Sequence, residues 1–344
     1  MNLSFSICNV VQPLISFTGG LNTNPLHFHN HGNKDKVVVV MGATGTGKSR
    51  LAIDLAKKFQ AEIINSDKIQ VYRGLEIATN KVTEEESRGV PHHILGTVDP
   101  NVDYSAANFC HDALLAIDSI IEQKKLPIIA GGSNSFIKSL VNDDPYFASR
   151  YECCFLWVDV APRIHQRFVS ERVDQMVQAG LVDEVRGIFD PNANYTRGIR
   201  RAIGVPEMDR FLRAERNADP ETLETLRQIA IDDIKKNTRN LVHRQMQKIR
   251  DLKDLWGWNL HHIQATEAFL KQGKASHEAW ERLVVSSSVR ILTEFCPQSP
   301  ASMQNFPKSP STTVITRKVH QCLLCTIMQI PATPPYHNRI TKII

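Results

Sequence analysis

The sequence predicts an α/β fold, in which helices flank a parallel sheet, and two observations support this prediction. Continuous apolar runs that end near Val40, Ile64, Ala130 and Val160 alternate with segments of helical spacing, which is typical of parallel strands buried on both faces. The first run leads directly into a glycine-rich segment with the GxxxxGK[ST] pattern of a P-loop. We therefore predict a P-loop NTPase-like core, a smaller helical region after it and a disordered C-terminal tail.

Composition narrows the class of protein. The 344 residues contain 41 Lys and Arg against 36 Asp and Glu, and this small positive balance does not indicate binding to DNA or to a large RNA. Seven cysteines, an odd number scattered along the chain, favour a reducing compartment over a disulfide framework. No apolar run approaches the roughly 20 residues that a membrane span needs. We expect a soluble intracellular monomer without a membrane partner.

The N-terminal residues 1–35 precede the predicted core. Residues 1–33 contain no Asp, Glu, Lys or Arg. A lack of acidic residues is typical of organelle transit peptides, but those peptides are rich in Arg, which is missing here. Two interpretations stay open, a plastid-targeting segment and a disordered N-terminus. The corresponding locations are the plastid and, otherwise, the cytoplasm.

The phosphate loop, residues 42–49, lies between a predicted strand at Val37–Val40 and a predicted helix at about Ser49–Phe59. It consists of Gly42, Ala43, Thr44, Gly45, Thr46, Gly47, Lys48 and Ser49. The glycines permit positive φ, so that successive N–H groups can point inward at a polyphosphate. Lys48 adds a positive charge, Ser49 a hydroxyl suited to Mg²⁺, and the helix N-terminus a partial positive charge. This context predicts binding of a phosphorylated ligand.

Asp67 follows the second predicted strand, which begins at Ala61. Ligands of open parallel sheets lie beyond the carboxyl ends of the strands, so we expect Asp67 near the phosphate loop. Three roles stay open for it: a Mg²⁺ ligand, a general base, or the N-cap of the next helix. Residues 68–104 then follow without a clear period, as lids and substrate loops often do.

The rest of the core is predicted from two further helices and two further strands. The helices lie at about 106–124 and 162–179, and the strands at 126–130 and 155–160. The strand at 126–130 ends in Gly131 and Gly132, before Ser133. A glycine pair at this point indicates close approach of the backbone to a ligand or to a neighbouring strand. We assign residues 36–180 to the P-loop core.

From Leu181 onward the patterns typical of strands cease and helices dominate. A long helix begins at Asp219-Pro220 and runs to about Trp256. On this helix Lys235 and Arg239 are spaced i, i+4 and leave one face, while Arg244 lies well round it. Such a stripe is either a solvated face or a clamp for an anionic substrate. Residues 181–285 form the predicted substrate-binding part.

The predicted tail covers residues 286–344. After Glu294 the chain contains no acidic residue, while prolines recur to its end. This composition is typical of disordered segments.

Several ordered motifs between about Lys36 and Val285 resemble the plant-type adenylate isopentenyltransferases, the cytokinin synthases related to tRNA dimethylallyltransferases. The motifs are GATGTGKS (42–49), INSDKIQVYRGLEIATNK (64–81), GVPHH (89–93), IIAGGSNSF (128–136), FLWVDV (155–160), RGIRRAIG (197–204) and IKKNTRNLVHRQ (234–245). Taken together in this order they are far more specific than the P-loop pattern alone.

The resemblance implies a reaction and a set of roles. The phosphate loop holds dimethylallyl diphosphate with Mg²⁺ as cofactor, and the adenine N6 amine attacks the allylic C1 while diphosphate leaves. Asp67 acts as the base and Thr44 orients the bridging oxygen. Lys48 and Ser49-bound Mg²⁺ meet the charge of the leaving group. The remaining diphosphate- or nucleotide-binding residues implied are Ser133, Lys235, Arg239 and Arg244.

The implied acceptor is a free adenine nucleotide, ATP or ADP before AMP. The segments SDKIQVYRGLEIATNK and GGSNSF are closer to the adenylate branch than to the tRNA branch, and no complete Cys₂His₂ module follows them. Two alternatives stay open. One is a tRNA adenine-37 dimethylallyltransferase, and the other is a small-molecule kinase that uses ATP on the same loop.

Overall fold

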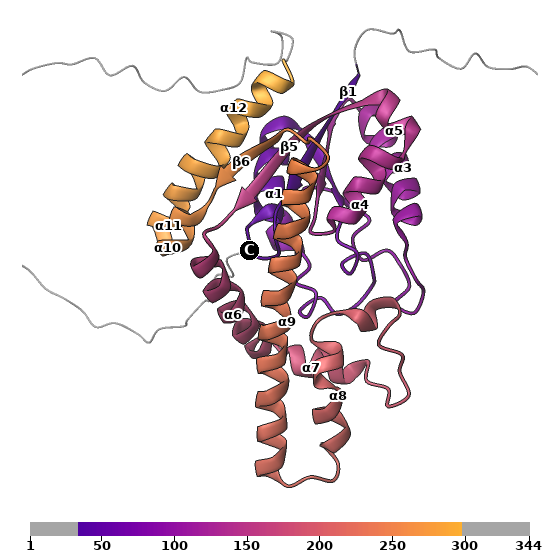
Figure 1. Cartoon of the computed structure of the whole chain (residues 1–344), viewed down its shortest axis with the longest axis vertical. Coiled ribbons are helices and arrows are strands. Elements are labelled where there is room, and N and C mark those ends of the chain that lie inside the picture. Colours follow the sequence, from indigo (N-terminus) through magenta and orange to yellow (C-terminus); the bar gives the residue numbers. More distant parts are fainter. Residues whose placement is uncertain (1–33, 298–344) are drawn as a thin grey trace, which may run out of the picture. The chain divides into compact units, whose positions relative to one another are not determined.

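A computed structural model describes residues 34–297, which contain a six-stranded sheet (Figure 1). The strands are β1 (Asp35–Met41), β2 (Ala61–Asn65), β3 (His92–His93), β4 (Leu126–Ala130), β5 (Tyr151–Asp159) and β6 (Leu260–Gln264). They lie in the order β3-β2-β4-β1-β5-β6, and every neighbouring pair is parallel. The carboxyl ends therefore meet at one edge of the sheet, and the predicted α/β fold is confirmed.

The central strand β1 is buried on both of its faces. Its odd-numbered residues from Val37 to Met41 belong to one core cluster, and Val38 and Val40 belong to another. Alternate residues of a strand point to opposite faces, so each cluster lies on its own side of the sheet. A continuous valine run is what a strand between two helical layers requires.

Helices contribute further residues to each of the two core clusters. The first cluster includes residues of α3 (Ala106–Glu122), α4 (Asn134–Lys138), α5 (Pro145–Arg150), α6 (Pro162–Gln178), α7 (Leu181–Gly187), α8 (Val205–Ala214) and α9 (Pro220–Asp254). The second includes α1 (Lys48–Phe59), α10 (Thr266–Leu270), α11 (Gly273–Trp280) and α12 (Ser286–Phe295). Short turns of helix complete the described elements: α2 (Glu84–Ser87), a 3₁₀ turn at Gly198–Arg201, and π turns at Ser139–Asp143 and Glu281–Val285.

Side-chain caps set the predicted helix starts. Ser105 Oγ accepts the Asn108 N–H at 3.2 Å, and Asn108 Oδ1 accepts the Ser105 N–H at 3.0 Å. This reciprocal pair satisfies two amides that the first turn of α3 leaves unbonded. Asp219 caps α9 without a reciprocal bond, because its Oδ1 accepts the Thr222 N–H at 2.9 Å.

The sheet continues beyond Leu181, which the sequence analysis did not predict. Strand β6 pairs with β5 from Phe155↔Leu260 to Asp159↔Gln264. It is an edge strand, and only Ile263 of its five residues is buried. The segment LHHIQ therefore lacks the continuous apolar run by which the central strands were identified.

Helical structure also extends past residue 286, so the predicted start of the tail is wrong. Helix α12 covers Ser286–Phe295, with Ser288 and Leu292 fully buried. Three consecutive serines made the helical pattern of this segment difficult to recognise. In the structure Leu292 belongs to the core cluster on the second face of the sheet. The rest of the predicted tail, from residue 298, and the possible transit peptide at 1–33 lie outside the described residues.

Helix α9 connects two parts of the structure. Its C-terminal half packs beside the sheet and along α6, and its N-terminal half pairs with α8 as a hairpin that projects away from the sheet (Figure 1). Between residues 34 and 297, no helix is both long and apolar enough to cross a membrane.

Candidate active site

A cavity of about 260 Å³ opens at the carboxyl edge of the sheet. Its lining comes from the phosphate loop, from residues 67–70 after β2, from residues 78–80, from residues 130–132 at the end of β4, and from α6, residues 201–203 and α9. The predicted site residues among the lining are Thr44, Gly45, Gly47, Lys48, Ser49, Asp67 and Arg244. The structure thus brings the phosphate loop, the predicted base and one predicted arginine together.

Three predicted binding residues shape the loop without lining the cavity. Gly42 and Ala43 are buried, and the Ala43 carbonyl accepts both the amide and the hydroxyl of Thr46, at 3.3 and 3.0 Å. Among the described residues, the amides of Gly45 and Gly47 donate to no carbonyl or side chain. These two amides are therefore available to an anion, as expected of a backbone nest.

Lys48 is buried within the loop. Its side chain donates to the Ala43 carbonyl at 2.8 Å, and the residue is 8% exposed. Burial lowers the pKa of Lys48 from 10.5 to about 8, an effect that Asp67 opposes and Arg172 reinforces. Burial disfavours the charged form of the amine, and an anion beside the amine favours that form. A bound anion therefore offsets the effect of burial.

All three polar groups of Thr44 are bonded to side chains of α6 and α9. Its amide donates to Gln245 Oε1 at 2.7 Å, and its carbonyl accepts from His165 Nε2 at 2.8 Å. Its hydroxyl oxygen accepts from Arg172 Nη2 at 2.9 Å. Since that oxygen is an acceptor in this bond, its own hydrogen is free to donate into the cavity.

Asp67 closes a turn rather than starting a helix, and it also lines the cavity. Its Oδ1 accepts the amides of Ile69 at 2.9 Å and Gln70 at 3.4 Å, which closes the turn after β2. No hydrogen bond within residues 34–297 reaches Oδ2, and Asp67 lines the cavity. Ser133 lies outside the lining and supports the same turn, because its Oγ accepts the Lys68 N–H at 2.9 Å.

The cavity is strongly cationic. Five cationic residues line it, and Asp67 is the one carboxylate among the described residues that do so. The cationic residues are Lys48, Lys68, Arg172, Arg201 and Arg244. Burial lowers the pKa of Arg172 to about 10. Burial also lowers the pKa of Lys68, and the positive charges of Arg201 and Lys248 lower it further. Such an excess of positive charge favours a polyphosphate ligand.

The other two predicted cations of α9 do not line the cavity. Lys235 forms an ion pair with Asp174 of α6 at 2.6 Å. Arg239 Nη1 donates to Ser170 Oγ of the same helix at 3.0 Å. Both side chains therefore join α9 to α6, and of the three predicted cations of α9 only Arg244 lines the cavity.

One part of the lining is apolar. Val173 and Met176 come from α6, and Ile234 and Leu241 come from α9. These side chains give the cavity a surface that excludes water beside a charged loop.

The C-terminal segment supports the phosphate loop from the second face of the sheet. The Trp280 ring lies against Gly47, where an added Cβ would come within 2.5 Å of Trp280 Cη2. Trp280 is 2% exposed, and its Nε1 donates to Asp54 Oδ2 at 2.9 Å. The guanidinium carbon of Arg50 lies 4.5 Å from the centroid of the Trp280 ring. Gly47 also has a φ of +88°, which favours glycine at this position.

Comparison with known proteins places the chain in a family. A family model described as IPP transferase matches residues 70–149 and 142–251, more than half of the chain. Adenylate isopentenyltransferase 5, chloroplastic, of Arabidopsis thaliana is 56% identical over 294 residues, which cover 84% of this chain and 88% of that protein. The chain belongs to the IPP transferase family. The resemblance that the motifs indicated is thereby confirmed.

Other relatives represent a second compartment and a second branch of the IPP transferase family. Adenylate isopentenyltransferase 7, mitochondrial, of Arabidopsis thaliana is 49% identical and covers 86% of this chain and 90% of its own length. The same plant's tRNA dimethylallyltransferase 2 is 31% identical, over 76% of this chain and 80% of its own length.

Solved structures share the fold. A eukaryotic dimethylallyltransferase acting on tRNA superposes with a TM-score of 0.65 at 24% identity, covering 80% of this chain and 82% of that one. A tRNA isopentenylpyrophosphate transferase from Bacillus halodurans gives a TM-score of 0.61 at 24% identity, over 76% of this chain and 98% of that one.

Sequence reasoning missed several residues of this IPP transferase site, namely His165, Arg172, Arg201, Gln245 and Trp280. A usable indication existed for two of them. His165 and Arg172 are seven residues apart, two turns of the helix that follows a predicted central strand. They therefore share one face of a helix that starts at the ligand-binding edge of the sheet.

Proposed function

We propose that the protein transfers the dimethylallyl group of dimethylallyl diphosphate to the N6 amine of adenine in ATP, ADP or AMP, the first step of cytokinin biosynthesis. The observation that carries this proposal is a single cavity that combines the phosphate loop, an apolar wall and the open carboxylate oxygen of Asp67. The motifs and the adenylate isopentenyltransferase relatives support the same reaction.

The phosphate loop binds the donor in this proposal. The amides of Gly45 and Gly47 and the ammonium group of Lys48 contact the diphosphate, and Arg244 reaches it from α9. The free hydroxyl hydrogen of Thr44 donates to the bridging oxygen, on which negative charge develops as the C1–O bond breaks. Donors that are held in place before the reaction stabilise this charge more than water does.

Asp67 acts on the acceptor. The N6 amine forms a bond to C1 while the C1–O bond breaks, and the N6 proton passes to Asp67 Oδ2. The oxygen suits this role because Oδ1 is occupied by the turn, whereas Oδ2 is open to the cavity. A positioned general base of this kind contributes roughly 10²–10⁴-fold to the rate.

The residues also fit Mg²⁺. The described residues contain no group of three or more His, Cys, Asp or Glu side chains that could hold a metal ion. Mg²⁺ in proteins often takes most of its ligands from water and substrate phosphates. Ser49, which lines the cavity, would hold it together with the diphosphate. When bound, the ion neutralises charge on the leaving group.

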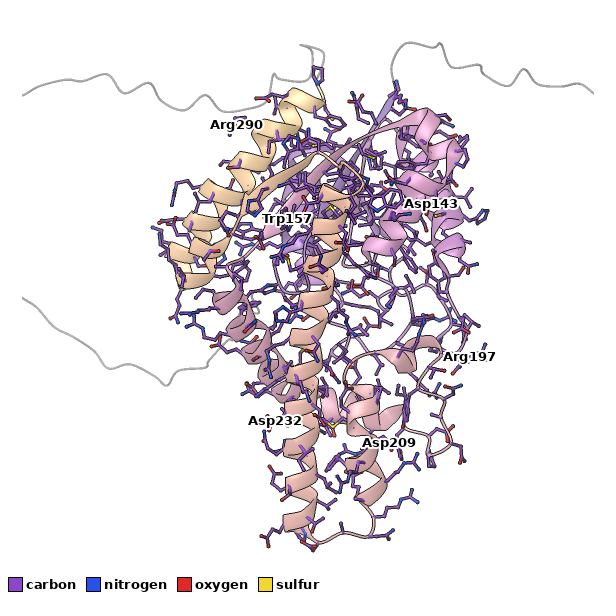
Figure 2. The ribbon with its side chains drawn as sticks, viewed as in Figure 1. Asp143, Trp157, Arg197, Asp209, Asp232 and Arg290 are labelled. Atoms are coloured by element: carbon purple, nitrogen blue, oxygen red, sulfur yellow. The ribbon has the colours of Figure 1, made fainter. Side chains whose placement is uncertain are left out.

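Charge on the α8–α9 hairpin favours a free nucleotide over tRNA as the acceptor. Residues 205–237, which form this hairpin, contain eight acidic and six basic side chains, and Figure 2 shows Asp209 and Asp232 on its two helices. A net negative surface repels an RNA backbone. By contrast, Lys68, Arg201 and Arg244 line the cavity, and these cations support ATP and ADP as preferred acceptors.

We further propose a plastid location, because several relatives are named chloroplastic. The monomeric state stays a prediction that sedimentation velocity of the purified protein would check.

A product assay tests the proposed function. The full-length protein is incubated with dimethylallyl diphosphate and Mg²⁺, and with AMP, ADP, ATP or an anticodon stem-loop that contains adenine-37. We expect N6-dimethylallyl nucleotide from the free nucleotides and a loss of at least roughly 10²-fold in Asp67→Asn. The amide of Asn can still accept the turn's hydrogen bonds, so donor binding persists in this variant. Prenylated RNA alone, or ATP-dependent phosphorylation without prenyl transfer, would contradict the proposal.

A further inference from the structure

Gln245 connects the two sides of the candidate active site. Its Oε1 accepts the Thr44 N–H of the phosphate loop at 2.7 Å, and its Nε2 donates to the Gly132 carbonyl at 2.9 Å. A backbone N–H can only donate and a carbonyl can only accept, so both partners impose the same orientation of the amide. One buried side chain of α9 thus spans the loop after β1 and the turn after β4.

The turn at Gly132 lies beside the predicted base. A Cβ added to Gly132 would come within 2.4 Å of Gln245 Nε2 and 3.3 Å of Asp67 Oδ2. The absence of a side chain at this position lets the amide approach the backbone. The same turn is attached to α9 a second time, because Asn134 Nδ2 donates to the Gln245 carbonyl at 3.2 Å.

We propose that Gln245 is a positioning residue, which fixes the phosphate loop relative to Asp67 and thereby the donor carbon relative to the acceptor amine. This inference rests on the proposed prenyl transfer. Gln245 is not among the described residues that line the cavity, so it acts through Thr44 and Gly132 without touching the substrates.

The partition of the donor between two nucleophiles reports this role. When the C1–O bond breaks, diphosphate leaves and C1 bonds either to N6, which passes a proton to Asp67, or to water, which yields dimethylallyl alcohol and a proton. Transfer to N6 depends on the placement of both substrates, whereas water requires no bound position. A shift of about 1 Å between donor and acceptor can lower transfer roughly 10²-fold.

Gln245→Met in the full-length protein is the informative variant, because it keeps the side-chain length and removes both hydrogen bonds. We expect kcat for nucleotide prenylation to fall about 10–100-fold and the ratio of prenylated nucleotide to alcohol to fall with it. Gln247→Met is the matched control. Gln247 lies on the same helix, is exposed, and bonds only to Asp251 among the described residues, so its kcat and product ratio stay within about twofold.

A structural role alone would give a different result. Loss of folded enzyme lowers prenylation and hydrolysis in the same proportion and leaves their ratio unchanged. An unchanged ratio in Gln245→Met, or a kcat within twofold of the wild type, would overturn the inference. If the wild type forms no prenylated nucleotide at all, the proposed function fails, and this outcome is distinct from an active wild type with an equally active variant.

A second variant keeps the test decisive if Gln245→Met does not fold. The carboxylate of Gln245→Glu can accept the Thr44 N–H but cannot donate to the Gly132 carbonyl. Its added charge affects KM for the anionic donor, so the product ratio is measured at saturation. We expect the ratio to fall again, and an unchanged ratio would refute the positioning role.

Discussion

Donor binding should weaken as pH rises above about 8, because burial lowers the pKa of Lys48 to about 8. The ligand does not titrate in this range, since the second ionisation of a phosphate group lies near pH 6. If only the ammonium form of Lys48 binds, Kd rises about twofold at pH 8 and roughly tenfold at pH 9, which is about 1.4 kcal/mol of binding free energy. Residual binding by the neutral amine would reduce this change.

The assay is calorimetric titration with an unreactive thio analogue of dimethylallyl diphosphate between pH 7 and pH 9.5, at constant ionic strength. Lys48→Arg is the control, because a guanidinium group stays charged over this range and removes the pH dependence. A wild-type Kd that changes less than twofold over the range would refute the reasoning. Equal pH dependence in Lys48→Arg would assign the titration to another group.

Four further substitutions, one of them a control, test particular contacts. Gly47→Ala should abolish donor binding, because its Cβ would come within 2.5 Å of the Trp280 ring at a φ of +88°, and calorimetry with the same analogue checks this. Arg244→Gln should raise KM for the donor about tenfold or more, since it removes a charged donor from the cavity, whereas Lys235→Gln should change KM less than about twofold. Steady-state kinetics that rank the two variants in the opposite order would contradict the assignment. His165 is buried and its pKa is lowered, so the unfolded state gains a proton near pH 6.5 before the folded state does. Stability is therefore lost as pH falls below about 6.5, and the urea midpoint of His165→Asn should fall less between pH 7.5 and pH 5.5 than that of the wild type.

The central part of the site was predictable because its information is local. The phosphate loop needs only its own residues, a strand before it and a helix after it, and all three are contiguous in the sequence. Asp67 was predictable from one topological rule, since strand ends of a parallel sheet share an edge. The structure adds that Asp67 closes a turn and does not cap a helix, and that it lines the cavity, whereas its role as the base stays a prediction.

The cations of α9 show what helical periodicity can and cannot decide. Lys235 and Arg244 are nine residues apart, which places them about 180° apart around a helix of 3.6 residues per turn. The two side chains therefore leave opposite faces of the helix, which argues against all three cations lining one cavity, although the resemblance implied that all three bind phosphate. Which of them faces the ligand depends on where α6 packs, and Asp174 of that helix binds Lys235.

Gln245, His165 and Trp280 were beyond sequence reasoning for a different reason. Each contacts the phosphate loop from more than 100 residues away along the chain. No periodic pattern or motif around a buried glutamine or tryptophan identifies the residue it contacts, because tertiary packing determines that contact. Strand β6 and helix α12 were missed for a related reason, since an edge strand and a serine-rich helix start depart from the composition of a buried core.

The walls of the cavity explain how a loop type associated with phosphoryl transfer suits a prenyl group. In phosphoryl transfer, charge spreads over the transferred group itself, so polar partners are needed on both sides of it. Here the cations and free amides gather at the phosphate loop, while Val173, Met176 and Ile234 line the cavity from α6 and α9. A leaving diphosphate matches the first surface and an allyl group matches the second. In the proposed reaction the phosphate loop would stabilise the departing diphosphate, and the apolar residues of α6 and α9 would hold the allyl group beside it.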